Sequence, residues 1–169
     1  MQNYLIFVEG ETEEHLLKQL QVIGKIQKIN LWDTDVNKHL RRFKPNTLVY
    51  VVYDTDVAQS STNIDRFNNN LAILQSKKFL GGIVQQTLNF EDELVIACSQ
   101  LKNTKALFKA FNAVNANEFK SQFIKTNNTL SILEKQGFNN LKLWQQPISG
   151  YVDNKYSDKR VALDKLPKR

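Results

Sequence analysis

The hydrophobic residues of the first half of the chain are concentrated in two short, continuous runs, at about 4–8 and 47–53. Runs of this length, rich in β-branched and aromatic residues and closed by Gly or Asp, predict buried strands of a parallel sheet. Apolar residues at helical spacing follow each run, over about 11–23 and 63–77. The order strand, helix, strand, helix indicates an α/β fold with a mostly parallel central sheet flanked by helices.

Two weaker strands and a small helix complete this first part of the chain. The strands are expected near 28–32 and over about 78–88, where β-branched residues are frequent, and the helix around 36–42.

The second part of the chain is predicted to be a helical C-terminal half. Because glycine and proline are too sparse to form a linker, we expect one domain over 1–169, with a core at about 4–95, a helical insert at about 104–136 and a basic tail at about 147–169. The elements expected here are helices at 90–99, 104–113, 117–124 and 128–136 and a last strand at 141–144.

The composition limits the classes of partner. Lys and Arg number 23 against 17 Asp and Glu, and the resulting net charge of +6 favours a polyanion such as nucleic acid. No apolar stretch approaches the roughly 18 residues of a membrane span, so no membrane partner is expected. Cys98 is the single cysteine and cannot form an internal disulfide, and no signal peptide precedes the first strand. We therefore expect a cytoplasmic protein.

Acidic residues follow both strong strands at the point where each strand is expected to end. Glu9 comes directly after the first strand, and Asp54 and Asp56 close the second. The carboxyl ends of parallel strands meet at one edge of the sheet, and two extended residues separated by one point to the same face. Mg²⁺ and Mn²⁺ prefer such oxygen ligands. The three acids are therefore the expected metal ligands and catalytic residues, with Glu9 also a candidate general acid or base. Gly10 allows close backbone approach and positive φ beside them.

The motifs around these acids resemble those of a known family. Residues 7–13, FVEGETE, are similar to the V-E-G-x-T-E opening of Toprim domains, and residues 49–56, VYVVYDTD, are similar to their D-x-D strand. Toprim is the catalytic fold of topoisomerases, bacterial primases and several nucleases. The small size and the T-E after the glycine most resemble its RloB and OLD-like branch. The resemblance covers about 4–95 and implies a Toprim-like Rossmannoid fold.

This resemblance also implies roles for individual residues. Glu9 matches the family's glutamate, a metal ligand or general acid or base, and Asp54 and Asp56 match its metal-binding aspartates. The residues at 57–59, VAQ, depart from the acidic or glycine residue that topoisomerases and primases carry soon after this motif. The implied activity is therefore phosphodiester hydrolysis, in phage defence, a mobile element or RNA processing.

A second acidic group, Glu91-Asp92-Glu93, follows the strand expected at 78–88. Nucleases of this superfamily place further acids after a later strand, so Glu91 and Glu93 are candidate ligands of a second metal ion, which would stabilise both the attacking and the leaving oxygen. The alternative is that acids in the first turn of a helix only complement its dipole.

Basic residues that could contact nucleic acid fall into three groups. The alternative for each group is that it is only a solvated patch of the surface. The C-terminal group lies beside Tyr151 and Tyr156, whose rings could stack on bases, and could fold over the acidic edge. The candidates are Lys155, Lys159 and Arg160 in this group, Arg41 and Arg42 beside Lys44 in the second, and Lys77 and Lys78 in the third.

Three classes of function stay open. The first is a nuclease that uses Mg²⁺ or Mn²⁺ to hydrolyse DNA or RNA. The second is a non-catalytic or partner-dependent module that binds nucleic acid or protein and works with an ATPase encoded elsewhere. The third, a small-molecule phosphatase, is disfavoured because such enzymes usually carry an aspartate nucleophile on the first strand, where this chain has Glu9.

Overall fold

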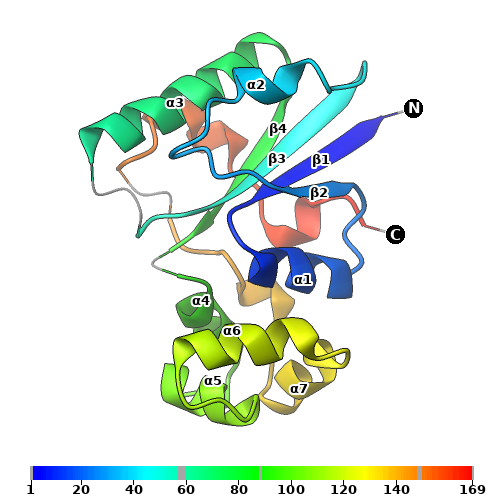
Figure 1. Cartoon of the computed structure of the whole chain (residues 1–169), viewed down its shortest axis with the longest axis vertical. Helices are drawn as coiled ribbons and strands as arrows, with labels where there is room; N and C mark the ends of the chain where they lie inside the picture. The colour runs from blue at the N-terminus through cyan, green and yellow to red at the C-terminus, as the bar shows by residue number, and fades with distance from the viewer. Residues whose placement is uncertain (1, 57–59, 88, 148–149, 169) are drawn as a thin grey trace.

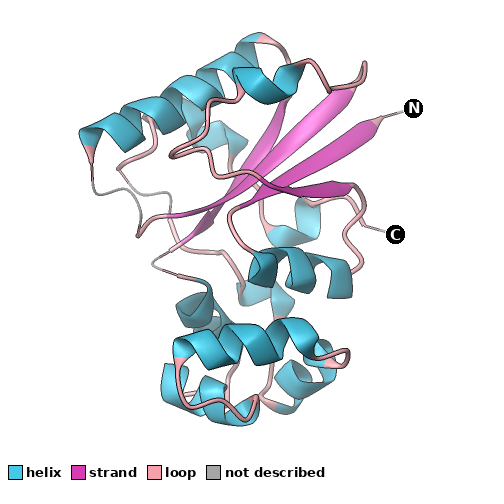
Figure 2. Cartoon of the chain, in the orientation of Figure 1, coloured by secondary structure: helices cyan, strands magenta, loops and turns pink. Residues whose placement is uncertain are grey.

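The centre of the molecule is a four-stranded parallel sheet with the order β2-β1-β3-β4. The structure is a computed structural model, and it describes residues 2–56, 60–87, 89–147 and 150–168. Helices lie on both faces of the sheet (Figures 1 and 2). The expected α/β fold, a parallel sheet flanked by helices, is confirmed. The strands are β1 (Asn3–Val8), β2 (Lys25–Lys28), β3 (Thr47–Asp54) and β4 (Leu80–Gln86).

Alternate residues of the strands supply two separate hydrophobic cores. On β1, Ile6 and Val8 belong to one core and Phe7 to the other. On β3, Val52 belongs to the first core and Tyr53 to the second. Burial of both faces explains why these strands read as continuous hydrophobic runs instead of alternating ones.

The first core is covered by α1 and by the helical second part of the chain, which Figure 1 shows below the sheet. Aromatic rings hold this part together, because Phe123 of α6 contacts Phe90, Phe111 and Phe119 at centroid distances of 5.2–5.4 Å. The helices are α1 (Glu11–Gln19), α4 (Phe90–Ala97), α5 (Thr104–Ala110), α6 (Ala116–Lys125) and α7 (Thr129–Lys135).

The second core lies under α2 (Asn37–Leu40), α3 (Ser61–Ser76) and the 3-10 helix η2 (Asn154–Lys159). Within it the Trp32 ring stacks on Phe67 with centroids 4.1 Å apart. Tyr156 of η2 is fully buried here. Its ring is therefore unable to stack on a nucleic-acid base, so the expectation is wrong for Tyr156, whereas Tyr151 is exposed.

The C-terminal tail packs along the sheet instead of folding over its acidic edge. The Val161 amide donates to the Ile83 carbonyl of β4 at 3.0 Å, and the backbone of Lys168 forms an antiparallel β-bridge with that of Val22. Between these contacts, η3 (Leu163–Lys165) and Leu166 enter the first core.

Some expected element boundaries are wrong. The helix expected to reach residue 23 ends at Gln19, with Leu20 as its C-cap. Gln21 has a φ of 56°, and the Val22 amide donates to the Leu17 carbonyl at 3.1 Å, which closes the cap. The strand expected at 28–32 lies earlier, at β2.

The strand expected at 141–144 is also wrong, since a 3-10 helix, η1 (Asn140–Lys142), stands there. Across the described part of the chain, every helix is too short or too polar to span a bilayer.

Candidate functional site

Glu9 and Asp54 meet at the carboxyl edge of the sheet. Glu9 directly follows β1, Asp54 is the last residue of β3, and these strands are paired neighbours. The Asp54 amide donates to Glu9 Oε1 at 2.9 Å, and Asn30 Nδ2 donates to Glu9 Oε2 at 3.3 Å. The structure thus brings together the two acids that the sequence placed on neighbouring strands.

Asp56 lies beside this pair but outside the strand. β3 ends at Asp54, and Asp56 is exposed in the turn that follows, so the two aspartates are not successive extended residues on one face. Asp56 is nevertheless close enough that its charge raises the pKa of both Glu9 and Asp54.

A fourth carboxylate, Glu13 of α1, belongs to the same cluster. Its side chain is 4% exposed, and its Oε1 accepts a hydrogen bond from Gln86 Nε2 at 3.0 Å. The same Gln86 amide group donates to Asp54. Glu13 was not among the residues expected at this site. The motif V-E-G-x-T-E could have indicated it, because the last glutamate of that motif aligns with Glu13.

Gly10 makes room for Glu13. A Cβ atom on Gly10 would lie 2.7 Å from Glu13 Oε2, so a larger residue would displace this carboxylate. The φ of Gly10 is −130°, which any residue adopts. The expected close approach is therefore present, whereas the expected positive φ is wrong.

Burial and mutual repulsion make these acids hard to ionise. The pKa of Asp54 is raised to about 9, first by burial and then by the charges of Glu9, Glu13 and Asp56. The pKa of Glu9 is raised to about 7, mainly by burial, although the Asp54 amide and the indole of Trp32 lower it. Trp32 Nε1 is itself buried and has no hydrogen-bond partner among the residues that the structure describes. A bound cation would reverse these shifts by favouring the ionised carboxylates.

The donor set suits a hard divalent cation, since it consists of carboxylate oxygens from adjacent strands and a helix start. Within the described ranges, no three Asp, Glu, His or Cys side chains already converge on one point. Gln86 holds both Glu13 and Asp54, so these carboxylates would have to turn away from its amide group to share an ion. The chemistry of the residues therefore fits a metal ion, and binding requires rearrangement of their hydrogen bonds.

A hollow of about 370 Å³ opens beside the acids, with one wall from the helical part of the chain. Lys120 and Ile124 of α6 line it together with Glu9 and Asp54. Lys120 Nζ also lies 3.6 Å from Glu91 Oε1. An anionic group entering the hollow would therefore meet an ammonium group as well as the carboxylates.

Glu91 and Glu93 do not join this cluster of acids, and each contacts other parts of the protein. Glu93 is fully buried, and its two oxygens accept from the amides of Thr87 at 2.8 Å and Trp144 at 3.0 Å. Glu91 is 5% exposed and faces Lys120. Neither lines the hollow among its described residues.

The basic residues predicted to contact nucleic acid do not form one surface, because the tail group and the group at 41–42 lie in different parts of the molecule. In the tail, Lys155 pairs with Asp153 at 2.9 Å and Lys159 lies 3.8 Å from Asp158, so both are engaged locally. Arg160 donates to the Gln145 carbonyl at 2.5 Å.

The second predicted group lies at the other end of the sheet. Arg41 and Arg42 follow α2 in the segment that leads to the start of β3. The structure therefore does not bring them to Glu9 and Asp54.

Comparison of the chain with protein-family models, with curated proteins and with solved structures found no match.

Proposed function

We propose that this protein is a Toprim-like nuclease that hydrolyses phosphodiester bonds of nucleic acid with Mg²⁺ or Mn²⁺. The observation that carries the proposal is the hydrogen-bonded pair of Glu9 and Asp54 at the carboxyl edge of a parallel sheet, with Glu13 and Asp56 beside it. Ligands bind at this edge in α/β folds, and a cluster of acids there is compatible with a site for a divalent cation.

In this proposal Glu9, Asp54 and Asp56 hold the metal ion, and Glu13 supports them through Gln86. When bound, the ion would polarise the scissile phosphate and favour ionisation of a water molecule. The other role proposed for Glu9 is to accept or return a proton beside the ion, as a general acid or base. Lys120, which also lines the hollow, would bind a phosphate oxygen.

The net charge of +6 supports nucleic acid as the substrate class, because phosphate neutralisation dominates affinity for it. We further propose a cytoplasmic location, with which the buried free thiol of Cys98 is compatible. Phage defence, a mobile element or RNA processing is the proposed setting, by analogy with the family that the motifs resemble.

The test is cleavage of labelled single-stranded and double-stranded DNA and RNA with Mg²⁺, Mn²⁺ or a chelator. Glu9→Gln is expected to reduce cleavage by about 10²–10⁴-fold, the range for loss of an acid–base group. Asp54→Asn removes a proposed ligand of the ion and is expected to abolish metal-dependent cleavage. Glu134→Gln, at an exposed position on α7, is the matched control and is expected to cleave normally.

The alternative is a partner-dependent binding module, and the hydrogen bonds that tie Glu13 and Asp54 to Gln86 favour it. Binding of nucleic acid without cleavage, unchanged in Glu9→Gln and Asp54→Asn, would reject the nuclease proposal and support this alternative. Cleavage that appears only when an ATPase partner is added would retain the nuclease chemistry and show that the partner is required.

A further inference from the structure

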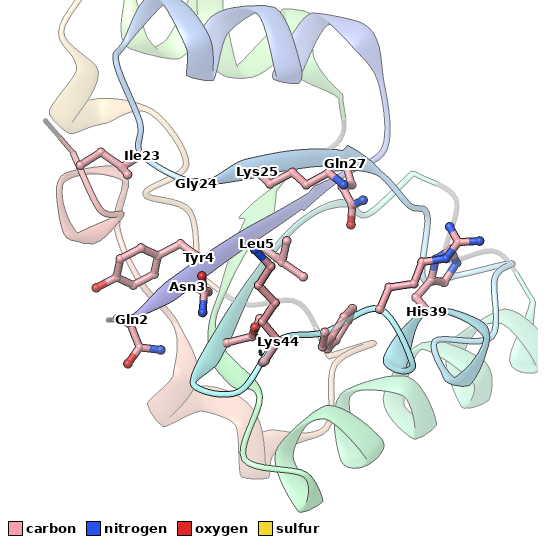
Figure 3. A pocket seen from close by; sticks show the side chains of 13 residues that line it. Gln2, Asn3, Tyr4, Leu5, Ile23, Gly24, Lys25, Gln27, His39 and Lys44 are labelled. Carbon is pink, nitrogen blue, oxygen red and sulfur yellow. Dashed lines mark hydrogen bonds between the residues drawn. The ribbon is translucent and has the colours of Figure 1, made fainter.

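A second cavity, of about 450 Å³, lies at the opposite end of the sheet from the acids. Its walls are the starts of β1, β2 and β3 and the segment 39–47 (Figure 3). Leu5 is the last β1 residue that lines this cavity, and Glu9 lines the hollow beside the acids, so at about 3.3 Å per residue the two linings lie about 13 Å apart along the strand. The cavity is thus a separate site, and its volume falls within the range of about 300–1,000 Å³ for small-molecule pockets.

The lining of this cavity carries cations without counter-charges. Lys25, Arg42 and Lys44 line it, and its described lining residues include no Asp or Glu. Within the described ranges none of the three forms an ion pair, whereas Lys28, on the same strand as Lys25, pairs with Glu11. Three exposed cations line one open cavity, and an anion that entered it would offset their mutual repulsion. The charge pattern therefore indicates an anionic ligand.

The cavity also has an apolar and aromatic wall. Leu5 of β1 and Phe43 of the segment 39–47 line it, and Figure 3 shows the Lys44 side chain extending toward Leu5. The Phe43 ring is held by Phe7 and Phe79, with centroids 6.1 and 5.2 Å away. A fixed aromatic ring next to cations suits a planar group that carries a negative charge.

The cavity is formed before any ligand enters. The segment 39–47 is fastened to the start of β1, because the Asn3 amide donates to the Asn46 carbonyl at 2.9 Å and Asn3 Nδ2 donates to the Pro45 carbonyl at 3.0 Å. The Gln27 side chain also lines the space and can hydrogen-bond the edge of a planar ligand. A preformed pocket avoids much of the entropy cost of ordering its walls.

We propose that this cavity binds a nucleotide, with Lys25, Arg42 and Lys44 on its phosphate and Phe43 against its base. Inorganic phosphate would satisfy the charges but leave the apolar wall uncovered, and a nucleoside would do the reverse. The site does not depend on the proposed nuclease activity, because no acid of the carboxyl edge lines it.

The test uses the full-length Asp54→Asn variant, labelled with ¹⁵N, in a chelator, so that metal binding at the carboxyl edge contributes nothing. Amide resonances are followed while nucleoside monophosphates, the corresponding nucleosides, inorganic phosphate and a short 5′-phosphorylated oligonucleotide are added separately. The proposal expects a nucleoside monophosphate to shift the amides of Gly24, Lys25 and Phe43 and to leave that of Gly10 unchanged.

Three substitutions locate the binding. Arg42→Ala and Lys44→Ala are each expected to weaken binding about tenfold, the loss of one charge-assisted hydrogen bond. Arg41→Ala removes the same charge one residue away but outside this cavity, and is expected to bind normally. Because all three side chains are exposed, the variants should fold, which circular dichroism checks.

The outcomes are distinct. Equal weakening by Arg41→Ala, or no shifts with any phosphate ligand, would overturn the proposal. If inorganic phosphate or a nucleoside binds as tightly as the monophosphate, the proposal that the cations and Phe43 bind one ligand together would be overturned. Binding of the oligonucleotide alone would overturn a free nucleotide as ligand and assign the cavity to nucleic acid.

Discussion

The Asp54 amide donates a 2.9 Å hydrogen bond to the Glu9 carboxylate, which joins the ends of β1 and β3. This bond holds Glu9 in place but leaves the Asp54 carboxylate next to a second negative charge in a mostly buried position. The pKa of Asp54 is consequently raised to about 9 and that of Glu9 to about 7. Metal-free protein at neutral pH is therefore destabilised by its own site, and the size of this effect can be measured.

Asp54→Asn is expected to stabilise the metal-free protein at alkaline pH. Below the ordinary pKa of 3.8 the carboxyl is protonated in both the folded and unfolded states, so the substitution changes little. As pH rises toward about 9 the unfolded state ionises first, and the folded protein loses stability that the variant keeps. Urea unfolding from acid to alkaline pH in a chelator should show the difference growing across this window. A difference independent of pH would contradict it.

Gly10→Ala is expected to disturb metal binding without disturbing the fold. The added methyl group would lie 2.7 Å from Glu13 Oε2, so the Glu13 carboxylate must leave its place beside Gln86. We expect Mn²⁺ affinity, measured by titration calorimetry, to fall by about 10–100-fold, as for loss of an outer-shell partner. Gly150→Ala is the control, since nothing lies within 4 Å of the Cβ that it adds. Equal Mn²⁺ affinity in the two variants would show that Glu13 does not support the ion.

Lys120→Gln is expected to weaken substrate binding while leaving metal affinity intact. The ammonium group lines the hollow together with the acids, so its loss removes a phosphate contact. We expect about a tenfold rise in KM, and the slope of log affinity against log salt should fall by about one. Lys125→Gln, on the same helix but outside the described lining, is the matched control. The same change in both variants would show that Lys120 affects binding only through the net charge of the protein.

Glu93→Gln separates a structural role from a metal ligand. Each Glu93 oxygen accepts a backbone amide, and the substitution turns one acceptor into a donor facing a donor. We expect the free energy of unfolding to fall by about 1–3 kcal/mol with Mn²⁺ affinity unchanged. Calorimetric titration and urea unfolding measure the two quantities on the same samples. Lost Mn²⁺ affinity without lost stability would restore Glu93 as a ligand of a second ion.

The strands and the pairing of Glu9 with Asp54 were predictable because they depend on local sequence and on strand direction. Continuous apolar runs specify strands buried on both faces, and parallel strands bring their carboxyl ends together. The place of Glu13 was less predictable, since it depends on space beside Gly10 and on the side chain of Gln86, 73 residues further along the chain. Lys120 reaches the site only because α6 packs near α1.

The segment 141–144 was assigned wrongly for a local reason. Its residues LKLW favour a strand by composition, but the Asn139 side chain accepts from the Leu141 amide and starts a 3-10 turn. Trp144 then adopts a φ of 58°, which no strand allows. Its indole N–H donates to Gln86 Oε1 at 3.1 Å. The backbone of 141–144 is therefore set by the position that the buried Trp144 ring occupies.

The pairing of Val161 with Ile83 also affects how copies of this protein meet in solution. A strand at the border of a sheet offers unpaired backbone groups that template aggregation. Residues 160 and 161 cover part of that border along β4, while on the far side β2 carries two charged residues, Lys25 and Lys28. Val161→Pro removes the amide that pairs with Ile83 but keeps Leu163 and Leu166 in the first core. It is expected to loosen this cover and to cause self-association through strand pairing at β4, even with the acids at the carboxyl edge intact.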